Sequence, residues 1–371
     1  MFQSAFLTRI VLLLMFVNMS GCAVNPEVET RDAVSPRLPF TYQPTPQTAS
    51  HGGVRAILQD RDGNFWFGSQ FEGVCRVDGG QIRHFTEVDG LSDDQVRVIH
   101  EAADGSIWFD NGVGISSWDG ERFTTHATRD YPPMSGWSLQ PSDLWFKSNE
   151  SHGFNELERD AGVYRLHDGG LTYLTLPLPP PLRSSTGYSV TGFAKGRGGR
   201  IWIATYDAVF GFDGESFTII DGARMGLREG EGVPHVRCVF EDSRGRVWIG
   251  NNGVGVVVID GNSTVGLAPL AGVGDALLRM GIPMTASASV NRDQSLQRVF
   301  SLGEDRDGNV WIGTIDGGAW RYDGRELRQF TASDGLTSKS VMAIYLDRDG
   351  VLWLGGEGVF RLRGDRFERV H

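Results

Sequence analysis

Three arginines occupy the same position of a repeated pattern, and their chemistry suits the binding of an anion. Arg55, Arg97 and Arg237 each follow a valine that begins a short apolar run. A guanidinium group can donate two parallel hydrogen bonds to a carboxylate or a sulfate. The alternative interpretation is that each arginine pairs with a nearby carboxylate of this acidic protein, and the sequence leaves both open.

Polar and aromatic residues form a second candidate set, because they follow the tryptophan-containing run of each repeat. Such side chains suit the hydroxyl groups of a sugar, although a solvated loop carries the same residue types. The candidate ligand-binding residues of this set are Gln70, Asn111, Asn149, Tyr206, Asn251 and Glu357.

Catalytic and metal-binding patterns are weak in this sequence. His152 lies near Glu150 and Glu156, a combination suited to general acid–base chemistry, and His235 lies close to Arg237. A lone histidine is more often a surface residue, so we name no catalytic residue and keep His152 as a candidate ligand-binding residue. The Asp-Arg-Asp-Gly turns lack the further spaced acids of a calcium loop, and no Cys/His spacing suggests zinc. We expect neither a metal nor a cofactor.

These residues belong to a unit that occurs seven times and is marked by a tryptophan, with a valine twelve residues before it in six units. Each unit has room for four short strands, and the 50 glycines suit the many turns between them. One twisted four-stranded sheet cannot bury both of its faces. We therefore predict an all-β fold, a seven-bladed β-propeller of four-stranded antiparallel blades, over residues 51–371. The marker tryptophans are Trp66, Trp108, Trp145, Trp202, Trp248, Trp311 and Trp353.

The repeat also predicts how the blades pack and where the ring closes. The tryptophans should pack between adjacent blades. Only the unit of Trp145 lacks the valine. The last unit supplies four strands by itself, yet residues 39–42 (PFTY) resemble an outer strand that would complete the final blade. Cys75 and Cys238 occupy different strand positions, so we expect no disulfide between them.

The motif V-x-x-I-x-x-D-x-D-G-x-x-W-x-G-T, followed by G-G-x-x-R-Y-D-G, resembles the two-component regulator propeller repeat. The resemblance is clearest in residues 299–336, is close in 54–91 and 341–364, and weakens in the third unit. In that family such repeats form extracytoplasmic sensor regions of hybrid histidine kinases, which commonly sense oligosaccharides. The resemblance implies a non-enzymatic binding or sensing module for a glycan fragment or a signalling partner. The alternative is a lyase or hydrolase similar to the streptogramin lyases, using His152 or His235.

The first 50 residues predict export and a lipid anchor. Arg9 precedes the apolar run IVLLLMFVNM (10–19), which is too short to span a bilayer and typical of a cleaved signal over residues 1–21. The stretch NMSGC resembles a lipoprotein signal, so we expect Cys22 to carry the lipid and residues 22–50, which are rich in proline, to form a linker. The protein would face the periplasm or the cell exterior, on the outer membrane if the source is Gram-negative.

The net charge limits the classes of partner, and the loop lengths indicate where a partner or ligand would bind. A net charge of −11 argues against nucleic acid, and we expect a monomeric propeller held at the membrane by its lipid. Long connections fall in residues 147–162, 223–235 and 264–297. Because strands alternate in direction, these connections should emerge on one face, next to the three arginines. We therefore expect the ligand or partner on this face, although tolerated surface insertions would look the same.

Overall fold

The computed structural model describes residues 53–126, 131–147, 159–227, 234–261, 263–266 and 296–370. They lie within a compact unit, Pro44–His371. The predicted signal and linker, Cys22 and residues 39–42 lie outside the described residues, as does most of the three long connections. The statements of absence below concern the described residues alone.

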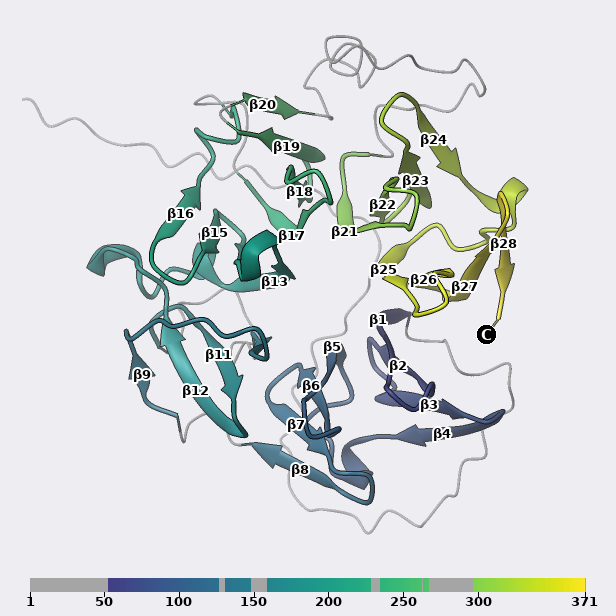
Figure 1. Ribbon diagram of the computed structural model, residues 1–371, viewed down its shortest axis with the longest axis horizontal. Coiled ribbons are helices and arrows are strands. Elements are labelled where there is room, and N and C mark those ends of the chain that lie inside the picture. The colour runs from purple at the N-terminus through teal and green to yellow at the C-terminus, as the bar shows by residue number, and fades with distance from the viewer. Residues whose placement is uncertain are drawn as a thin grey trace, which may run out of the picture. The chain divides into compact units, whose positions relative to one another are not determined.

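Seven four-stranded sheets succeed one another around a common centre (Figure 1), so the predicted seven-bladed β-propeller is confirmed. The first blade contains β1 (Val54–Gln59), β2 (Phe65–Ser69), β3 (Val74–Asp78) and β4 (Gln81–Phe85). The second contains β5 (Val96–Glu101), β6 (Ile107–Asn111), β7 (Ile115–Trp118) and β8 (Phe123–His126). The third contains β9 (Pro133–Met134), β10 (Leu144–Phe146), β11 (Gly162–His167) and β12 (Gly170–Thr175).

The other four blades follow in chain order. The fourth contains β13 (Val190–Lys195), β14 (Ile201–Thr205), β15 (Val209–Phe212) and β16 (Phe217–Ile220). The fifth contains β17 (Val236–Glu241), β18 (Val247–Asn251), β19 (Val256–Asp260) and β20 (Ser263–Gly266). The sixth contains β21 (Val299–Glu304), β22 (Val310–Thr314), β23 (Ala319–Tyr322) and β24 (Leu327–Phe330). The seventh contains β25 (Val341–Leu346), β26 (Leu352–Gly356), β27 (Gly358–Arg363) and β28 (Arg366–Arg369). Short 3-10 helices occur at Glu87–Asp89, Pro180–Leu182, Thr186–Tyr188, Arg197–Gly199 and Ala332–Asp334.

The innermost strand carries the same irregularity in six blades. In the first blade Val54 pairs with Ser69 but Ala56 pairs with Gly68, so Arg55 is an extra residue without a partner across the ladder. The same register shift occurs at the second residue of β5, β13, β17, β21 and β25. A β-bulge of this kind bends the strand and redirects one side chain. It is therefore a built-in feature of the repeat.

The third blade departs from the repeat, and the expectation that each unit supplies its four strands in order is wrong for this blade. Its sheet has the order β10-β11-β12-β9, so β10, which carries the marker Trp145, is innermost. The two-residue β9 pairs in parallel with the outer side of β12. Pro133 stands twelve residues before Trp145, where the other units have valine. Proline has no N–H to donate, so it suits this outer edge and not an inner ladder.

The marker tryptophans pack between blades, as predicted. Trp248 is fully buried in a cluster with Val299 and Ile312 of the next blade. Trp311 lies in the same way against Val341 and Leu352. Because a single blade leaves a face uncovered, these interfaces hold most of the hydrophobic core.

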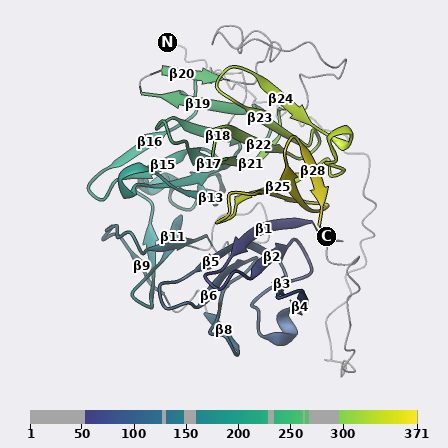
Figure 2. The same ribbon diagram turned by 45° about the vertical axis from the view of Figure 1, so that its right-hand side comes forward.

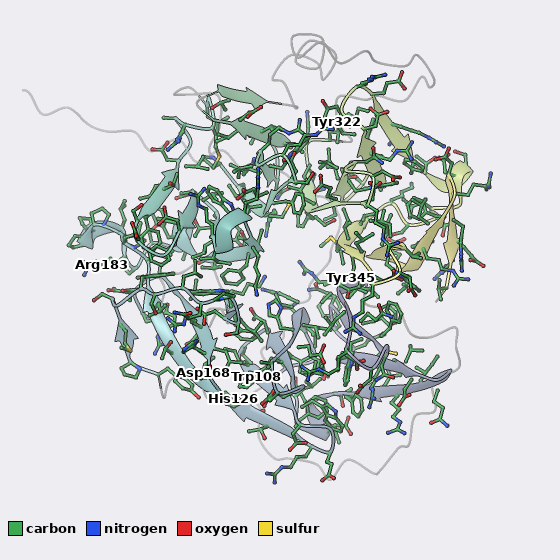
Figure 3. All side chains as sticks on the ribbon, in the orientation of Figure 1. Trp108, His126, Asp168, Arg183, Tyr322 and Tyr345 are labelled. Carbon is green, nitrogen blue, oxygen red and sulfur yellow. The ribbon has the colours of Figure 1, made fainter. Side chains whose placement is uncertain are left out.

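Closure of the ring relies on packing and hydrogen bonds between β1 and the last blade, which lie side by side (Figure 2). Trp353 packs against Phe65, with ring centroids 4.6 Å apart. The Gln59 N–H donates at 3.0 Å to the hydroxyl of Tyr345, which is labelled in Figure 3. Among the described residues, both terminal blades are complete by themselves, so no strand is exchanged across this junction.

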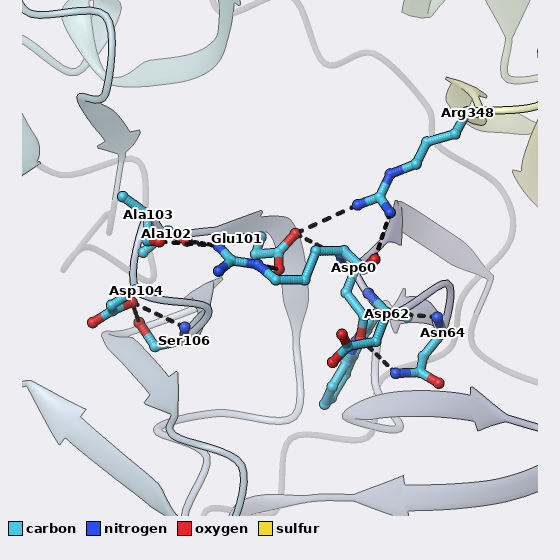
Figure 4. A network of polar contacts seen from close by, with 11 residues as sticks. Asp60, Asp62, Asn64, Glu101, Ala102, Ala103, Asp104, Ser106 and Arg348 are labelled. Atoms are coloured by element: carbon cyan, nitrogen blue, oxygen red, sulfur yellow. Dashed lines mark hydrogen bonds and ion pairs between the residues drawn. The ribbon is translucent and has the colours of Figure 1, made fainter.

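An ion-pair network links three blades on the side of the connections between the first and second strands (Figure 4). Arg348 donates to the Arg61 carbonyl oxygen at 2.8 Å and lies 3.8 Å from the Glu101 carboxylate. Arg61 in turn pairs with Glu101 and donates to the Ala102 carbonyl oxygen. The two arginines thus join the last blade to the first and the first to the second.

Candidate functional site

Every blade contributes to the lining of a central cavity of about 370 Å³, and in each blade one of these lining side chains stands in or directly after the innermost strand at a comparable position. In six blades this side chain is the bulged second residue of the innermost strand, so the bulge turns it toward the centre. The third blade, which lacks that strand, supplies the residue directly after β10. In blade order the seven side chains are Arg55, Arg97, Lys147, Thr191, Arg237, Phe300 and Met342. The structure thus brings together the three arginines singled out in the sequence.

Lys147 is the cavity residue that the sequence analysis missed. Its backbone N–H donates to a carboxylate oxygen of Asp110 at 2.6 Å, and its Nζ donates to the Thr191 carbonyl oxygen at 3.1 Å. These bonds tie Lys147 to the blades on both sides. The signal in the sequence was Pro133, because the loss of the innermost strand is what lets Lys147 reach the centre.

The side chains that line the cavity make it positively charged. Among the described residues that line it, four are cationic and none is Asp or Glu. Burial, and then repulsion from Arg97 and Arg237, lowers the pKa of Arg55 to about 10. Burial, reinforced by Arg97 and opposed by Asp110, lowers the pKa of Lys147 to about 7. An anion in the cavity would relieve this repulsion.

Several buried donors of the cavity-lining side chains have no partner. Nε of Arg97, Nε of Arg237 and the Thr191 hydroxyl have no hydrogen-bond partner within the described part of the chain. A buried polar group without a partner is costly, and such groups in native structures call for an explanation. These three atoms are also closed off from solvent, so they add to the cost of burying the side chains but do not present donors to the cavity.

Arg237 is held in place by two aromatic rings. Its guanidinium carbon lies 5.1 Å from the centroid of Tyr206 and 5.0 Å from that of Phe300. Its Nη1 also donates to the Tyr206 hydroxyl at 3.4 Å. A stacked guanidinium keeps its donor edge free, which suits it to a planar anion.

The cavity has two chemically different sides. The cationic side chains come from the first, second, third and fifth blades, whereas the adjacent sixth and seventh blades contribute Phe300 and Met342. At these positions charge is therefore concentrated on one arc of the ring and the other arc is apolar. Further apolar lining residues, such as Ile99 and Val239, come from the blades of the charged arc.

The other predicted residues lie in different settings. Gln70 accepts a hydrogen bond from Arg55, and Tyr206 lines the cavity. Asn111 and Asn251 are only 1% and 0% exposed and are not among the cavity-lining residues. Glu357 is exposed, and its backbone N–H donates to the Ser338 hydroxyl. Asn149 and His152 lie outside the described residues.

His235 lies next to the cavity residue Tyr206, with ring centroids 4.8 Å apart. Burial, and then the charge of Arg237, lowers its pKa, which favours the neutral ring. Elsewhere in the described ranges, no group of three or more His, Cys, Asp or Glu side chains is placed to hold a metal ion. Within the same ranges, no helix has the length and apolar character needed to cross a membrane.

Four segments of the sequence match the family described as two component regulator propeller: residues 49–71, 230–253, 293–316 and 335–358. The chain carries two-component regulator propeller repeats. Each matched segment spans a bulged innermost strand and the tryptophan-containing strand beside it. The matched segments therefore include four of the residues that line the cavity, Arg55, Arg237, Phe300 and Met342.

Solved structures show the same fold at low sequence identity. The extracellular domain assigned to the hybrid two component system BT4673 of B. thetaiotaomicron is 18% identical, with a TM-score of 0.55. The match covers 84% of this chain but only 38% of that one. This chain thus spans less than half of that protein's length.

Two further structures with this fold are enzymes. A streptogramin B lyase is 15% identical, with a TM-score of 0.56, over 85% of this chain and 95% of the lyase. An inactive virginiamycin B lyase from Staphylococcus aureus, solved with quinupristin, is 12% identical, with a TM-score of 0.58, over 84% and 94%. At these identities the likeness concerns the fold alone. The sequence has no match among the curated proteins.

Proposed function

We propose that this chain is an extracytoplasmic binding and sensing propeller that takes up a small ligand, a glycan fragment, in its central cavity and does no catalysis of its own. The observation that supports this most strongly is the set of four basic side chains, from four different blades, that line one cavity with no acidic residue among its described lining residues. The fold that it shares with a two-component extracellular domain agrees with a sensing role.

The size of the cavity favours a small ligand over a protein. Its volume of about 370 Å³ lies within the range of small-molecule sites. A stable protein–protein interface instead buries about 1,200–2,000 Å² of surface. A signalling partner would have to dock on the surface around the cavity, and a screen in which no fragment binds would favour it.

A ligand screen tests the proposal. The full chain, purified in mild detergent, is heated with members of an oligosaccharide library, and its melting temperature is measured. A ligand that binds only the folded protein raises the melting temperature in a concentration-dependent way. We expect at least one fragment to do so, and we expect Arg97→Ala to abolish the shift. If no fragment binds, or if the shift survives in Arg55→Ala, Arg97→Ala and Lys147→Met alike, the cavity is not the site.

We also propose that the propeller is exported and anchored through Cys22. Lipidation of the cysteine that follows the signal would attach more than one acyl chain, which is enough for stable membrane binding. Cys22→Ser should therefore move the protein from the membrane fraction to the soluble fraction, with Cys75→Ser as the control that stays with the membrane. Equal partitioning of Cys22→Ser and wild type would contradict the anchor.

The enzyme alternative gains no support from the described residues. His235 has Tyr206 and Arg237 as neighbours, and neither is a carboxylate that would orient the ring as a general base. We therefore propose no second function.

A further inference from the structure

We infer that the ligand of the central cavity is a small molecule with at least two acidic groups on a body that has an apolar face. The acidic groups would be bound by Arg55, Arg97, Lys147 and Arg237, and the apolar face would lie against Phe300 and Met342. This inference rests on the proposed function and adds the chemical class and orientation of the ligand.

The first step of the argument is charge. Cations withdrawn from water cost several kcal/mol each unless a partner compensates them. The chain has 46 acidic residues against 35 basic ones, yet none of the described residues lining this cavity is acidic. Asp110, which is fully buried, accepts the backbone N–H of Lys147 and also offsets part of the positive charge there. The described lining has four basic side chains against this one neighbouring carboxylate, so positive charge remains in excess.

The second step is the number of hydrogen bonds. Each guanidinium carries five N–H donors and an ammonium three, whereas one carboxylate accepts about four hydrogen bonds. The protein uses one bond each from Arg55, Lys147 and Arg237 toward Gln70, Thr191 and Tyr206. The four basic side chains come from four different blades. One acidic group leaves most of their donors unpaired, and a second acidic group takes up about four more.

The third step is the apolar arc. Phe300 stacks on Arg237 and is followed around the ring by Met342, so the charged and apolar arcs meet at Arg237. An inorganic anion would leave this apolar surface uncovered. A sugar acid or a similar molecule covers it with its C–H face, because such faces bury apolar area on aromatic and thioether side chains.

Calorimetry with four probes on the full chain tests the inference. The probes are trigalacturonate, the neutral galactotriose, inorganic sulfate and inorganic phosphate. We expect trigalacturonate to bind more than tenfold more tightly than galactotriose, and added salt to weaken its binding. Sulfate and phosphate separate an acidic sugar from a free inorganic anion as the source of the negative charge.

Single-residue variants test which part of the ligand the charged side chains and the apolar side chains each contact. Arg97→Ala should weaken trigalacturonate binding by about 10- to 150-fold, the range for losing a hydrogen bond to a charged group. Phe300→Ala should weaken trigalacturonate binding but leave sulfate binding unchanged. Arg83→Ala is the matched control, because Arg83 is an exposed arginine on the outer strand β4. The melting temperature of each variant shows whether it is folded.

Three results would overturn the inference. If galactotriose binds as tightly as trigalacturonate, the ligand is not acidic, although the proposed function stands. If sulfate binds as tightly as trigalacturonate and Phe300→Ala changes neither, the ligand has no apolar body. If no probe and no library fragment binds, the proposed function fails together with the inference.

Discussion

Lys147 shows how the setting of one residue alters its chemistry. Its side chain lies among three arginines and bonds to the Thr191 carbonyl oxygen, and burial lowers its pKa from 10.5 to about 7. Between these two pH values the unfolded chain binds more protons than the folded one at this site. The free energy of unfolding therefore rises with pH from about 7 to 10.5, and below pH 7 the cost of the buried charge is fully present.

Removing this charge should stabilise the protein in a pH-dependent way. Lys147→Met keeps the backbone bond to Asp110 and should raise the free energy of unfolding at pH 6. The advantage over wild type should shrink by at least about 1 kcal/mol by pH 9, since one pKa unit corresponds to about 1.4 kcal/mol. Urea unfolding at both pH values measures it, with the exposed Lys339→Met as the control. A difference that stays constant with pH would contradict the prediction.

The sequence predicted part of this site at the level of residues. The shared position of Arg55, Arg97 and Arg237 was enough to group them, because the repeat places equivalent residues equivalently around the ring. It did not identify Lys147, whose position depends on a strand that one blade fails to form. Nor did it separate Tyr206, which lines the cavity, from Asn111 and Asn251, which are buried elsewhere. Polar residues at strand ends look alike in sequence.

The connection between the first and second strands of a blade is built around one aspartate. Oδ1 of Asp60 accepts the backbone N–H groups of Asp62 and Asn64, and its Oδ2 accepts Nδ2 of Asn64 and Nε1 of Trp66. The same aspartate-to-tryptophan bond recurs at Asp242, Asp305 and Asp347. The repeated D-x-x-G-x-x-W motif thus has a structural role, because it fixes the tryptophan between blades.

Breaking this device should cost stability without touching the cavity. Asp60→Ala leaves buried donors unpaired, including the Trp66 indole, and should lower the free energy of unfolding by about 2–4 kcal/mol. Asp62→Ala removes an exposed carboxylate of the same turn and serves as the control. Chemical unfolding compares them, and equal stability of the two variants would show that the hydrogen bonds of Asp60 contribute little.

At this scale the sequence was a good guide for six blades and a poor one for the third. The regular spacing of valine, Asp-Gly and tryptophan predicts the strands directly, because the valine begins the innermost strand, Asp-Gly forms turns and the tryptophan lies in the second strand. In the third unit Pro133 replaces the valine, and β9 instead joins the outer edge of the blade. The proline signals that a strand is lost from the centre, but parallel pairing on the outer edge depends on tertiary packing that no local pattern encodes.

The first and last blades form the one pair of neighbouring blades in the ring that the chain does not connect directly. The first and last blades meet through Trp353, Phe65 and Phe67, and through the bonds of Arg348. The sixth and seventh blades meet through the equally large Trp311, but there residues 331–340 also connect them along the chain. Loss of packing should therefore have different consequences at the two interfaces.

Trp353→Ala and Trp311→Ala form a matched pair for testing ring closure. Each should lower the free energy of unfolding by about 3–5 kcal/mol, as expected for a buried aromatic side chain. Only Trp353→Ala should speed amide hydrogen exchange in β1 and β25, because that junction can open locally. The opening free energy of these amides should then lie well below the free energy of global unfolding. If both variants accelerate exchange equally in these strands, closure is no weaker than any other interface.

The repeated bulge has a consequence for how such a protein changes over evolution or in the laboratory. Each bulged residue stands outside the regular pairing of its ladder, so the hydrogen bonds of its blade do not depend on its side chain. The six bulged positions and Lys147, which follows β10, are one lining position per blade, occupied in blade order by Arg, Arg, Lys, Thr, Arg, Phe and Met. Libraries randomised at these seven positions should yield a high fraction of folded variants with altered ligand selectivity, since other positions encode the scaffold.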